Sequence, residues 1–408
     1  MKKDKELVLL ADVGGTNVRF GTYQEGDETA HFDEKYLVSE FKSFEEAVQA
    51  YLDKTGKKPS LCVIGAAGNI DEDAKEILTS NTPWSVSVPK LMAKFPQFKK
   101  ASLDNDFALQ GWAIAGLESH QYRPLFSSHQ TTDLKSSKVL VLGLGTGCGT
   151  CLMMKNGEIN QTIFTSESGH SSLPYVDFGN IDNPLRDKVL KALKERYEKN
   201  GKGIVVEHII SGTGIRNVYH ALKDGVIPPD MNNLVTAFKI EKLAEAGDPT
   251  ALKTFDIVFA YLGAHTGSIA STIKADNVFY CGGLLASSWV QGRLEQSSYF
   301  KKQLEHRAGM TDAMKNLRFS VSLYREMAEK GAIVRANRLI NEVQTTEEKN
   351  RSNKNLLTAL CATYALIETE CPAPIKAKTL KHVRKIISSL ERYKVAMQKT
   401  GSRENSCN

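Results

Sequence analysis

The chain has 408 residues, more than the about 100–200 of an ordinary domain, so we expect two lobes. Its hydrophobic fraction of 41% and charged fraction of 25% are those of a globular protein and exclude a disordered chain. No run reaches the about 18 apolar residues that a membrane span needs, and Leu7–Leu10 is too short for a signal-peptide core. We therefore expect a cytoplasmic protein with no membrane span.

The net charge of +6 belongs to the C-terminal end. Residues 346–408 contain 12 Lys and Arg against 6 Asp and Glu, whereas residues 1–345 contain 41 of each sign. Because the body is electrically balanced and the excess belongs to the tail, the nucleic-acid hypothesis is weakened, and we expect no nucleic-acid partner.

The first half begins with a hairpin that has a glycine-rich tip. Leu7–Asp12 and Val18–Tyr23 are typical of strands, and Val13–Asn17 forms the turn between them. Apolar spacing then predicts, in chain order, a helix over Phe44–Leu52, a strand over Leu61–Ile64, a helix over Val88–Phe95, a strand over Ala101–Leu103 and a helix over Ala108–Leu117.

The second half repeats this opening after residues 118–137, a polar stretch that we interpret as the boundary between lobes. Val139–Leu142, a turn over Gly143–Gly147 and Gly149–Met154 form another strand–turn–strand unit, and Asn156-Gly157 predicts a further hairpin. Two such units indicate a duplicated architecture. Residues 184–262 are mainly helical, and the remaining elements are strands at Asp276–Tyr280 and Leu317–Leu323 and a helix at Lys330–Ile340.

The composition changes after residue 342. Thr345–Asn355 predicts a polar linker, and Leu356–Ile367 predicts a helix that Pro372 and Pro374 end. An amphipathic helix with a basic opposite face follows, its apolar positions being Leu380, Val383, Ile386, Ile387, Leu390 and Val395. This segment could bind a partner or an acidic membrane surface, but docking on the body or on another subunit is the favoured interpretation.

Both glycine turns have features that would allow them to bind phosphate. The chain has no G-x-x-x-x-G-K-[ST] pattern, but glycines let backbone N–H groups approach phosphate oxygens, and Thr16 and Thr146 add hydroxyl donors. Asp12, at the end of the first strand, could hold Mg²⁺ directly or through water. Cys148 and Cys151 form a C-x-x-C without a second pair, and a strand would point them to opposite faces, so we interpret them as structural.

Candidate acid–base groups lie elsewhere in the chain. Asp106 starts a helix directly after a strand, where it could act as a base or merely cap the helix. Glu167, His170 and Glu207 stand in small or apolar surroundings and could bind vicinal sugar hydroxyls. A lone histidine such as His170 is more often structural than a ligand.

Together, the motifs resemble the bacterial-type glucokinase family of the hexokinase/actin/Hsp70-like superfamily, over roughly residues 6–340. The matching stretches are Ala11–Arg19, Asn81–Trp84, Asn105–Ala108, Gly143–Gly147, Glu167–His170, Glu207–Gly214 and Gly282-Gly283. The cysteine-rich zinc motif of the related repressor/open-reading-frame/kinase (ROK) group is absent.

The resemblance implies a role for each matching position. Asp106 would be the base that takes the proton of the sugar 6-hydroxyl, and Asp12 would hold the metal. The implied sugar ligands are Asn105, Glu167, His170 and Glu207, with Asn81 close by. The implied nucleotide contacts are Gly14, Gly15, Thr16, Asn17, Gly145, Thr146, Gly147, Ser211, Gly212, Gly282 and Gly283.

The resemblance also implies the fold and the reaction. We expect an α/β chain with the two-lobed ribonuclease H-like (hexokinase/actin ATPase) fold, a central ligand cleft and a helical C-terminal extension. The expected parts are a small lobe at 1–120 completed by a returning helix near 328–342, a large lobe at 137–327 and a basic extension at 345–408.

The expected reaction is the phosphorylation of D-glucose to glucose 6-phosphate by ATP with Mg²⁺, in a homodimer. Two alternatives stay open. One is a kinase for another hexose or amino sugar, such as mannose, fructose or glucosamine. The other is a non-catalytic sugar sensor or regulator on the same fold.

Overall fold

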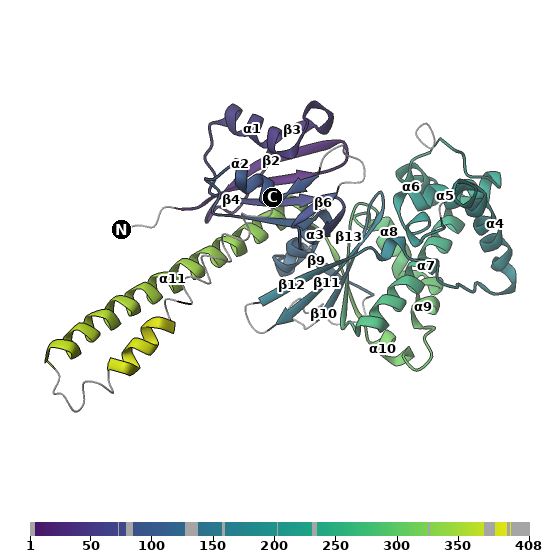
Figure 1. Ribbon diagram of the computed structural model, residues 1–408. Helices are drawn as coiled ribbons and strands as arrows, with labels where there is room; N and C mark the ends of the chain where they lie inside the picture. Colours follow the sequence, from purple (N-terminus) through teal and green to yellow (C-terminus); the bar gives the residue numbers. More distant parts are fainter. Residues whose placement is uncertain are drawn as a thin grey trace. The chain divides into compact units, whose positions relative to one another are not determined.

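The computed structural model describes residues 5–71, 73–78, 85–126, 138–156, 160–201, 203–230, 235–324, 327–370, 380–389 and 392. Contacts divide the chain into two compact units, Met1–Asn105 with Ala332–Asn408, and Asp106–Gly331. Figure 1 shows the helices and strands of both units.

The first unit is built on a five-stranded sheet that opens with the predicted hairpin. β1 (Leu7–Val13) pairs antiparallel with β2 (Asn17–Gln24) and parallel with β4 (Leu61–Ala66). β3 (Phe32–Leu37) and β8 (Lys100–Asn105) complete the order β3-β2-β1-β4-β8. A small sheet holds β5 (Asn69–Asp71), β6 (Glu76–Leu78) and β7 (Val86–Ser87).

Helices cover both faces of the five-stranded sheet. α1 (Phe44–Thr55) and α2 (Val88–Lys94) contribute to one core, in which Phe20 and Tyr51 lie 5.3 Å apart between ring centroids. Side chains alternate along a strand, so Val8 and Leu10 are buried toward the opposite face. The part of α11 (Met327–Glu370) that belongs to this unit contacts the same sheet, with the Tyr23 hydroxyl donating to Asn337 Oδ1 at 2.9 Å.

The second unit repeats the same strand plan. β10 (Lys138–Leu144), β11 (Cys148–Asn156) and β12 (Asn160–Ser166) form an antiparallel meander, and β13 (Asn277–Cys281) and β14 (Arg318–Ser322) follow in parallel with β10. The order β12-β11-β10-β13-β14-β9 therefore contains the plan of the first sheet plus one edge strand, β9 (Tyr122–Leu125). This confirms the predicted duplication.

Helices also cover both faces of the second sheet (Figure 1). α3 (Asp106–Ala115) packs on β11 and β12 on one face. The other core is formed with α4 (Gly179–Tyr197), α5 (Gly212–Asp224), α6 (Ala237–Glu245), α7 (Pro249–Ile273), α8 (Ser288–Gln296), α9 (Ser298–Glu305) and α10 (Thr311–Lys315). The 3₁₀ turns are η1 (Val38–Glu40), η2 (Ser119–Gln121), η3 (Ser168–His170), η4 (Glu198–Asn200) and η5 (Val206–His208).

Three expectations differ from the structure. The predicted boundary at 118–137 contains β9, which pairs with β14. The predicted linker over Thr345–Asn355 is wrong, because α11 runs through it without a break and so joins the returning helix to the start of the extension. By its contacts α3 belongs to the second unit, whereas the expected small lobe extended to residue 120.

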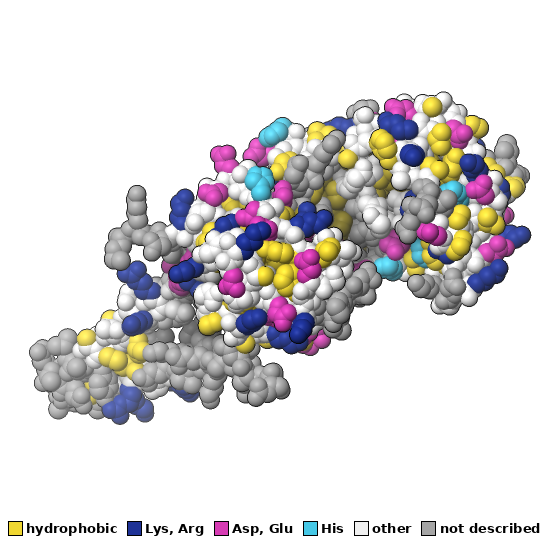
Figure 2. Space-filling view, turned by 90° about the horizontal axis from the view of Figure 1, so that it is seen from above, with side chains coloured by type: hydrophobic (Ala, Val, Ile, Leu, Met, Phe, Trp, Pro, Cys, Tyr) yellow, Lys and Arg dark blue, Asp and Glu magenta, His cyan; other side chains and the backbone are white. Residues whose placement is uncertain are grey.

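Basic and acidic side chains are interspersed over the face seen in Figure 2. Among the described helices, none combines the length and apolar character needed to cross a bilayer. Of the predicted amphipathic helix, residues 380–389 are helical, with Leu380, Val383 and Ile387 partly covered and Ile386 48% exposed.

Candidate functional site

The first glycine turn closes the β1–β2 hairpin. Gly14 N donates to Asn17 O at 2.9 Å, and Thr16 O accepts from Val38 N at 3.0 Å. β1, β4 and β8 are parallel, so this turn and the end of β8 lie at the same edge of the sheet. Ligands of α/β proteins usually bind at such carboxyl edges.

Asp12 and Arg19 face each other in the hairpin register and form an ion pair beside this turn. Arg19 Nε donates to Asp12 Oδ2 at 2.7 Å, and the guanidinium lies 5.1 Å from the Phe32 ring centroid. Sequence reasoning assigned no role to Arg19, although the pairing of strands around the turn could have placed it opposite Asp12.

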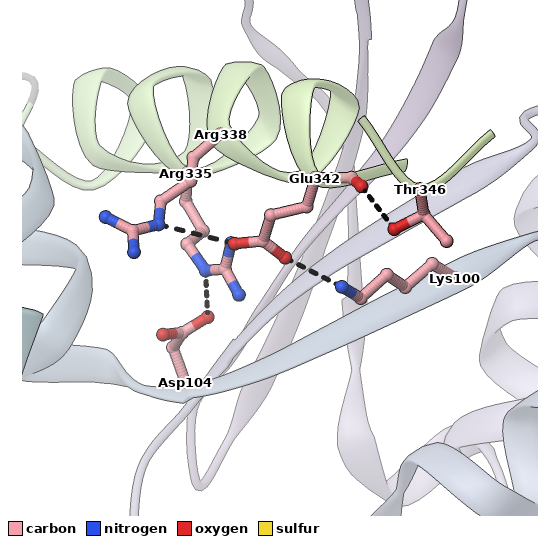
Figure 3. A network of polar contacts seen from close by, with 6 residues as sticks. All are labelled: Lys100, Asp104, Arg335, Arg338, Glu342 and Thr346. Atoms are coloured by element: carbon pink, nitrogen blue, oxygen red, sulfur yellow. Dashed lines mark hydrogen bonds and ion pairs between the residues drawn. The ribbon is translucent and has the colours of Figure 1, made fainter. Parts of the chain in front are cut away.

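Asn105 ends β8 at the same edge. Its side chain is buried, and Nδ2 donates to Gly68 O at 2.8 Å. Asp104 points to an ion pair with Arg335 on α11, with 3.1 Å between Asp104 Oδ2 and Arg335 Nε. Figure 3 shows this pair together with Lys100, Arg338 and Glu342. Asp104 is therefore a structural anchor for the strand that carries Asn105.

In the second unit, the other glycine turn joins β10 to β11. Gly145 N donates to Gly147 O at 3.0 Å, while Gly145 O accepts from Gly212 N at 2.8 Å. Gly212 is the first residue of α5, whose N-cap Ser211 accepts from Gly214 N. The turn thus meets the N-terminus of α5, where the helix dipole favours negative charge, while the N–H groups of Gly212 and Gly214 are bonded within the protein.

Gly282 brings the end of β13 to the same place. Its φ is +94°, and a Cβ there would lie 2.5 Å from Leu144 O, so only glycine fits. Leu284 N donates to Leu144 O at 3.1 Å. The structure therefore gathers the predicted nucleotide residues of this unit at the carboxyl ends of β10 and β13.

Glu207 links this turn to the predicted sugar ligands. Its Oε2 accepts from Cys148 N at 3.4 Å, and a Cβ on Gly147 would lie 2.8 Å from the same oxygen. His170 Nδ1 lies 3.8 Å from Glu207 Oε1, and His170 Nε2 lies 3.7 Å from Glu167 Oε2. The three ionisable residues named from the sequence are thus neighbours.

Backbone contacts hold the turns that carry these residues. Ser171 O accepts from Val206 N at 3.0 Å, which joins η3 to η5. Gly169 packs so closely that a Cβ would lie 2.3 Å from Cys148 O. Glu167 and His170 are exposed, with side-chain exposures of 53% and 59%, whereas Glu207 is more covered at 26%.

Asp106 is placed by its neighbour Phe107. The Phe107 ring fills the space over the paired residues Gly143 and Gly149, since a Cβ on either would come within 2.3 Å of the ring. Asp106 Oδ1 accepts from Phe107 N at 2.9 Å, and the residue is exposed. This packing anchors Asp106 beside the β10–β11 hairpin, a role for Phe107 that sequence reasoning missed.

Cys148 and Cys151 are both buried, which fits their interpretation as structural residues. Cys148 and Cys151 belong to different core clusters, so they point to opposite faces of the sheet. Burial raises the pKa of the Cys148 thiol to about 12, which keeps it protonated and unreactive. Within the described ranges, no group of three or more His, Cys, Asp or Glu could hold a metal ion.

The structure thus brings together the site residues within each unit. Gly14, Gly15, Thr16, Asn17, Asp12 and Asn105 lie at the edge of the first sheet, and Asp106, Gly145, Thr146, Gly147, Glu167, His170, Glu207, Ser211, Gly212, Gly282 and Gly283 lie in the second unit. Asn81 lies outside the described residues.

These paired sheets with helices on both faces form the two-lobed hexokinase-like fold. The Glucokinase family model matches residues 9–339, and the chain belongs to the glucokinase family. Glucokinase from Xanthomonas campestris pv. campestris strain B100 is 31% identical over 323 residues, covering 77% of this chain and 90% of that protein. Glucokinase from Stenotrophomonas maltophilia strain K279a is 29% identical, with the same coverage of 77% and 90%.

Two solved glucokinase structures have a fold similar to that of this chain. A glucokinase from an Antarctic psychrotroph has a TM-score of 0.62 at 25% identity, covering 81% of this chain and 98% of that chain. Glucokinase from Balamuthia mandrillaris, solved in complex with glucose, has a TM-score of 0.67 at 17% identity, covering 82% and 94%.

Proposed function

We propose that this glucokinase-family enzyme transfers the γ-phosphoryl group of ATP to the 6-hydroxyl of D-glucose. The observation that carries the proposal is the Glu207 carboxylate, which contacts both the second glycine turn and His170. A sugar-binding group thereby adjoins a phosphate-binding turn, as a sugar kinase requires.

Glu167, His170 and Glu207 would bind the sugar hydroxyls. A carboxylate accepts from two hydroxyls at once, and an imidazole donates or accepts. The spacings of 3.7 and 3.8 Å among the three are those of ion pairs and not of hydrogen bonds, so apart from the Cys148 N bond to Glu207 Oε2 their polar atoms could turn to a ligand. Asn105 and Asn81 are proposed as further sugar ligands.

The two glycine turns would hold the phosphates. In the second unit, Gly145, Thr146 and Gly147 offer a turn that abuts the N-terminus of α5, and Ser211, Gly212, Gly282 and Gly283 would bind the remaining nucleotide. In the first unit, the turn of Gly14, Gly15, Thr16 and Asn17 is closed by the bond from Gly14 N to Asn17 O, and its other polar groups would contact the phosphates. Helix N-termini and successive backbone N–H groups stabilise phosphate charge without a side-chain cation.

Asp12 is the proposed magnesium residue. Mg²⁺ in kinases is usually held by one or two carboxylates together with phosphates and water, so a single part-buried carboxylate beside a phosphate turn fits. When bound, Mg²⁺ would neutralise charge on the phosphates. The Arg19 ion pair would hold the Asp12 carboxylate in place beside the turn. A homodimer and a cytoplasmic location remain predictions.

Asp106 would be the general base, and its removal tests the proposal. A coupled assay of glucose 6-phosphate formation with ATP and Mg²⁺ should show activity in the wild type. Asp106→Asn should lower kcat by about 10²- to 10⁴-fold, because a general base contributes that much. Glucose binding, measured by calorimetry, should persist. Near-normal turnover in the variant would remove Asp106 as the base.

The same assay with mannose, fructose and glucosamine compares kcat/KM among sugars. A higher kcat/KM for one of these than for glucose would reassign the substrate. If the wild type has no activity on any hexose, the alternative of a non-catalytic sugar sensor or regulator on the same fold is favoured instead.

A further inference from the structure

A buried polar chain lies behind the turn that carries Glu167 and His170. Ser168 Oγ lies 2.7 Å from Thr150 Oγ1 on β11 and 3.2 Å from His265 Nε2 on α7. Thr150 is 2% exposed and His265 is 3% exposed, so both are core residues. The hydrogen bonds of Ser168 therefore join an exposed turn to two buried elements, β11 and α7.

His265 is suited to a fixed hydrogen bond. Burial lowers the pKa of its imidazole to about 4, so the ring is neutral at pH 7. A neutral imidazole has one donor and one acceptor nitrogen, and a serine hydroxyl can donate once and accept twice. Ser168 can consequently bond to Thr150 and His265 together, donating to one of them at most and accepting from the other.

The exposed side chains of the turn need such an anchor. The contacts among Glu167, His170 and Glu207 are ion pairs longer than hydrogen bonds, so they hold these exposed groups only loosely. Backbone contacts hold the end of the turn, where Ser171 O accepts from Val206 N at 3.0 Å, and the 2.9 Å bond from His170 N to Glu167 O sets its local shape. Ser168, between the two, bonds to a residue 97 positions away.

We propose that His265 is a positioning residue for the sugar. Through Ser168 it holds the η3 turn against the core, so that Glu167 and His170 meet the hydroxyls at a fixed separation. This inference rests on the proposed function, because it assumes that these two side chains bind the sugar.

Two substitutions remove the bond from opposite ends. His265→Phe keeps an aromatic ring in the core, and Ser168→Ala removes only a hydroxyl. Each should raise the KM for glucose by about 3- to 10-fold, the equivalent of one hydrogen bond. The KM for ATP should be unchanged, and kcat should stay within about twofold, because the loss is in ground-state sugar binding.

Two further variants separate positioning from packing. His265→Gln keeps a polar group at a similar reach and should restore most of the glucose affinity. The double variant of His265→Phe and Ser168→Ala should be no worse than the poorer single variant, because both remove the same bond. A merely structural histidine would lower the melting temperature and leave the KM for glucose unchanged.

Glu167→Gln, run in the same assay, distinguishes this inference from the proposed function. If Glu167→Gln raises the KM for glucose while both single variants leave it unchanged, the positioning role is overturned and the sugar site stands. If Glu167→Gln leaves the KM unchanged, the sugar site itself fails, and His265 has nothing to position. Should His265→Phe fail to fold, Ser168→Ala alone decides between these outcomes.

Discussion

At the scale of single residues, Gly147 has a steric reason to be glycine. A methyl group there would lie 2.8 Å from Glu207 Oε2, the oxygen that also accepts from Cys148 N. Gly145, two residues earlier, has open space, with nothing within 4 Å of an added Cβ. Neither has a positive φ, so alanine is compatible with both backbones.

Gly147→Ala should therefore displace the Glu207 carboxylate and raise the KM for glucose by about tenfold or more, since misplacing a binding group by about 1 Å can cost up to 10²-fold. Gly145→Ala is the matched control, and the KM for glucose should be unchanged whatever happens to the KM for ATP. Steady-state kinetics with glucose varied at saturating ATP measures both. Equal rises in the two variants would contradict the steric explanation.

Some residues of the candidate site could be predicted from the sequence, and others could not. The glycine turns and Asp12 follow from strand and turn patterns, and Glu167, His170 and Glu207 were candidates from their surroundings before the resemblance implied the same role. Reasoning from the residues alone left Asp106 open between base and cap. The partner of Ser168 could not be found, because His265 lies 97 positions away in an apolar helix and no local pattern joins them.

At the scale of elements, α11 has the clearest ion-pair anchor (Figure 3). Glu342 accepts from Lys100 on β8 at 2.7 Å, and Arg335 and Arg338 approach its other oxygen at 3.5 and 3.3 Å. Burial raises the pKa of Glu342, but the Lys100 hydrogen bond and the Arg335 charge together lower it below its ordinary 4.5. The ionised form is therefore favoured by folding.

A carboxyl whose pKa is lowered in the folded state stabilises above its unfolded pKa and loses that effect as the pH falls through the folded value. Glu342→Gln should thus lower the unfolding free energy at pH 7 by about 1 kcal/mol, a modest value because solvent screens a part-exposed group. The difference from wild type should vanish well below pH 4.5. Urea unfolding at several pH values measures it.

The control is Glu347→Gln on the same helix. Glu347 lies 3.8 Å from Lys99 and is 49% exposed, so its replacement should have little effect at any pH. A Glu342→Gln effect that persists unchanged at low pH would contradict the electrostatic origin.

Elements with strong local signals were predicted well. The two hairpins and the helix at Phe44 follow from alternation, glycine turns and apolar spacing. β9 was missed because its four residues, Tyr122–Leu125, include Pro124 and follow polar sequence, so only pairing with β14 makes them a strand. Thr345–Asn355 lacks the apolar spacing of a buried helix, which is why a linker was predicted there. It contains no Gly or Pro, however, so nothing in it ends the helix.

At the scale of the whole molecule, the charge and the site residues are separate along the chain. Residues 371–408 contain 9 Lys and Arg against 2 Asp and Glu, which leaves 44 against 45 in residues 1–370. All the proposed site residues lie between Asp12 and Gly283, and α11 ends at Glu370.

A chain that stops after Glu370 should therefore lose its net positive charge and keep its kcat and KM values within about twofold. Cation-exchange elution at pH 7 and the coupled glucose assay measure the two properties, with the full chain as reference. A large loss of activity would show instead that the extension takes part in catalysis or in its regulation.

The contact of Glu207 with the second turn has a consequence for binding equilibria. A nucleotide that shifts this turn also shifts a carboxylate proposed to hold glucose, so the two ligands would bind with a coupling free energy, commonly about 1–3 kcal/mol. Thermodynamic reciprocity then requires the same coupling free energy whichever of the two ligands binds first. The factor by which an ATP analogue changes the dissociation constant of glucose must equal the factor by which glucose changes that of the analogue.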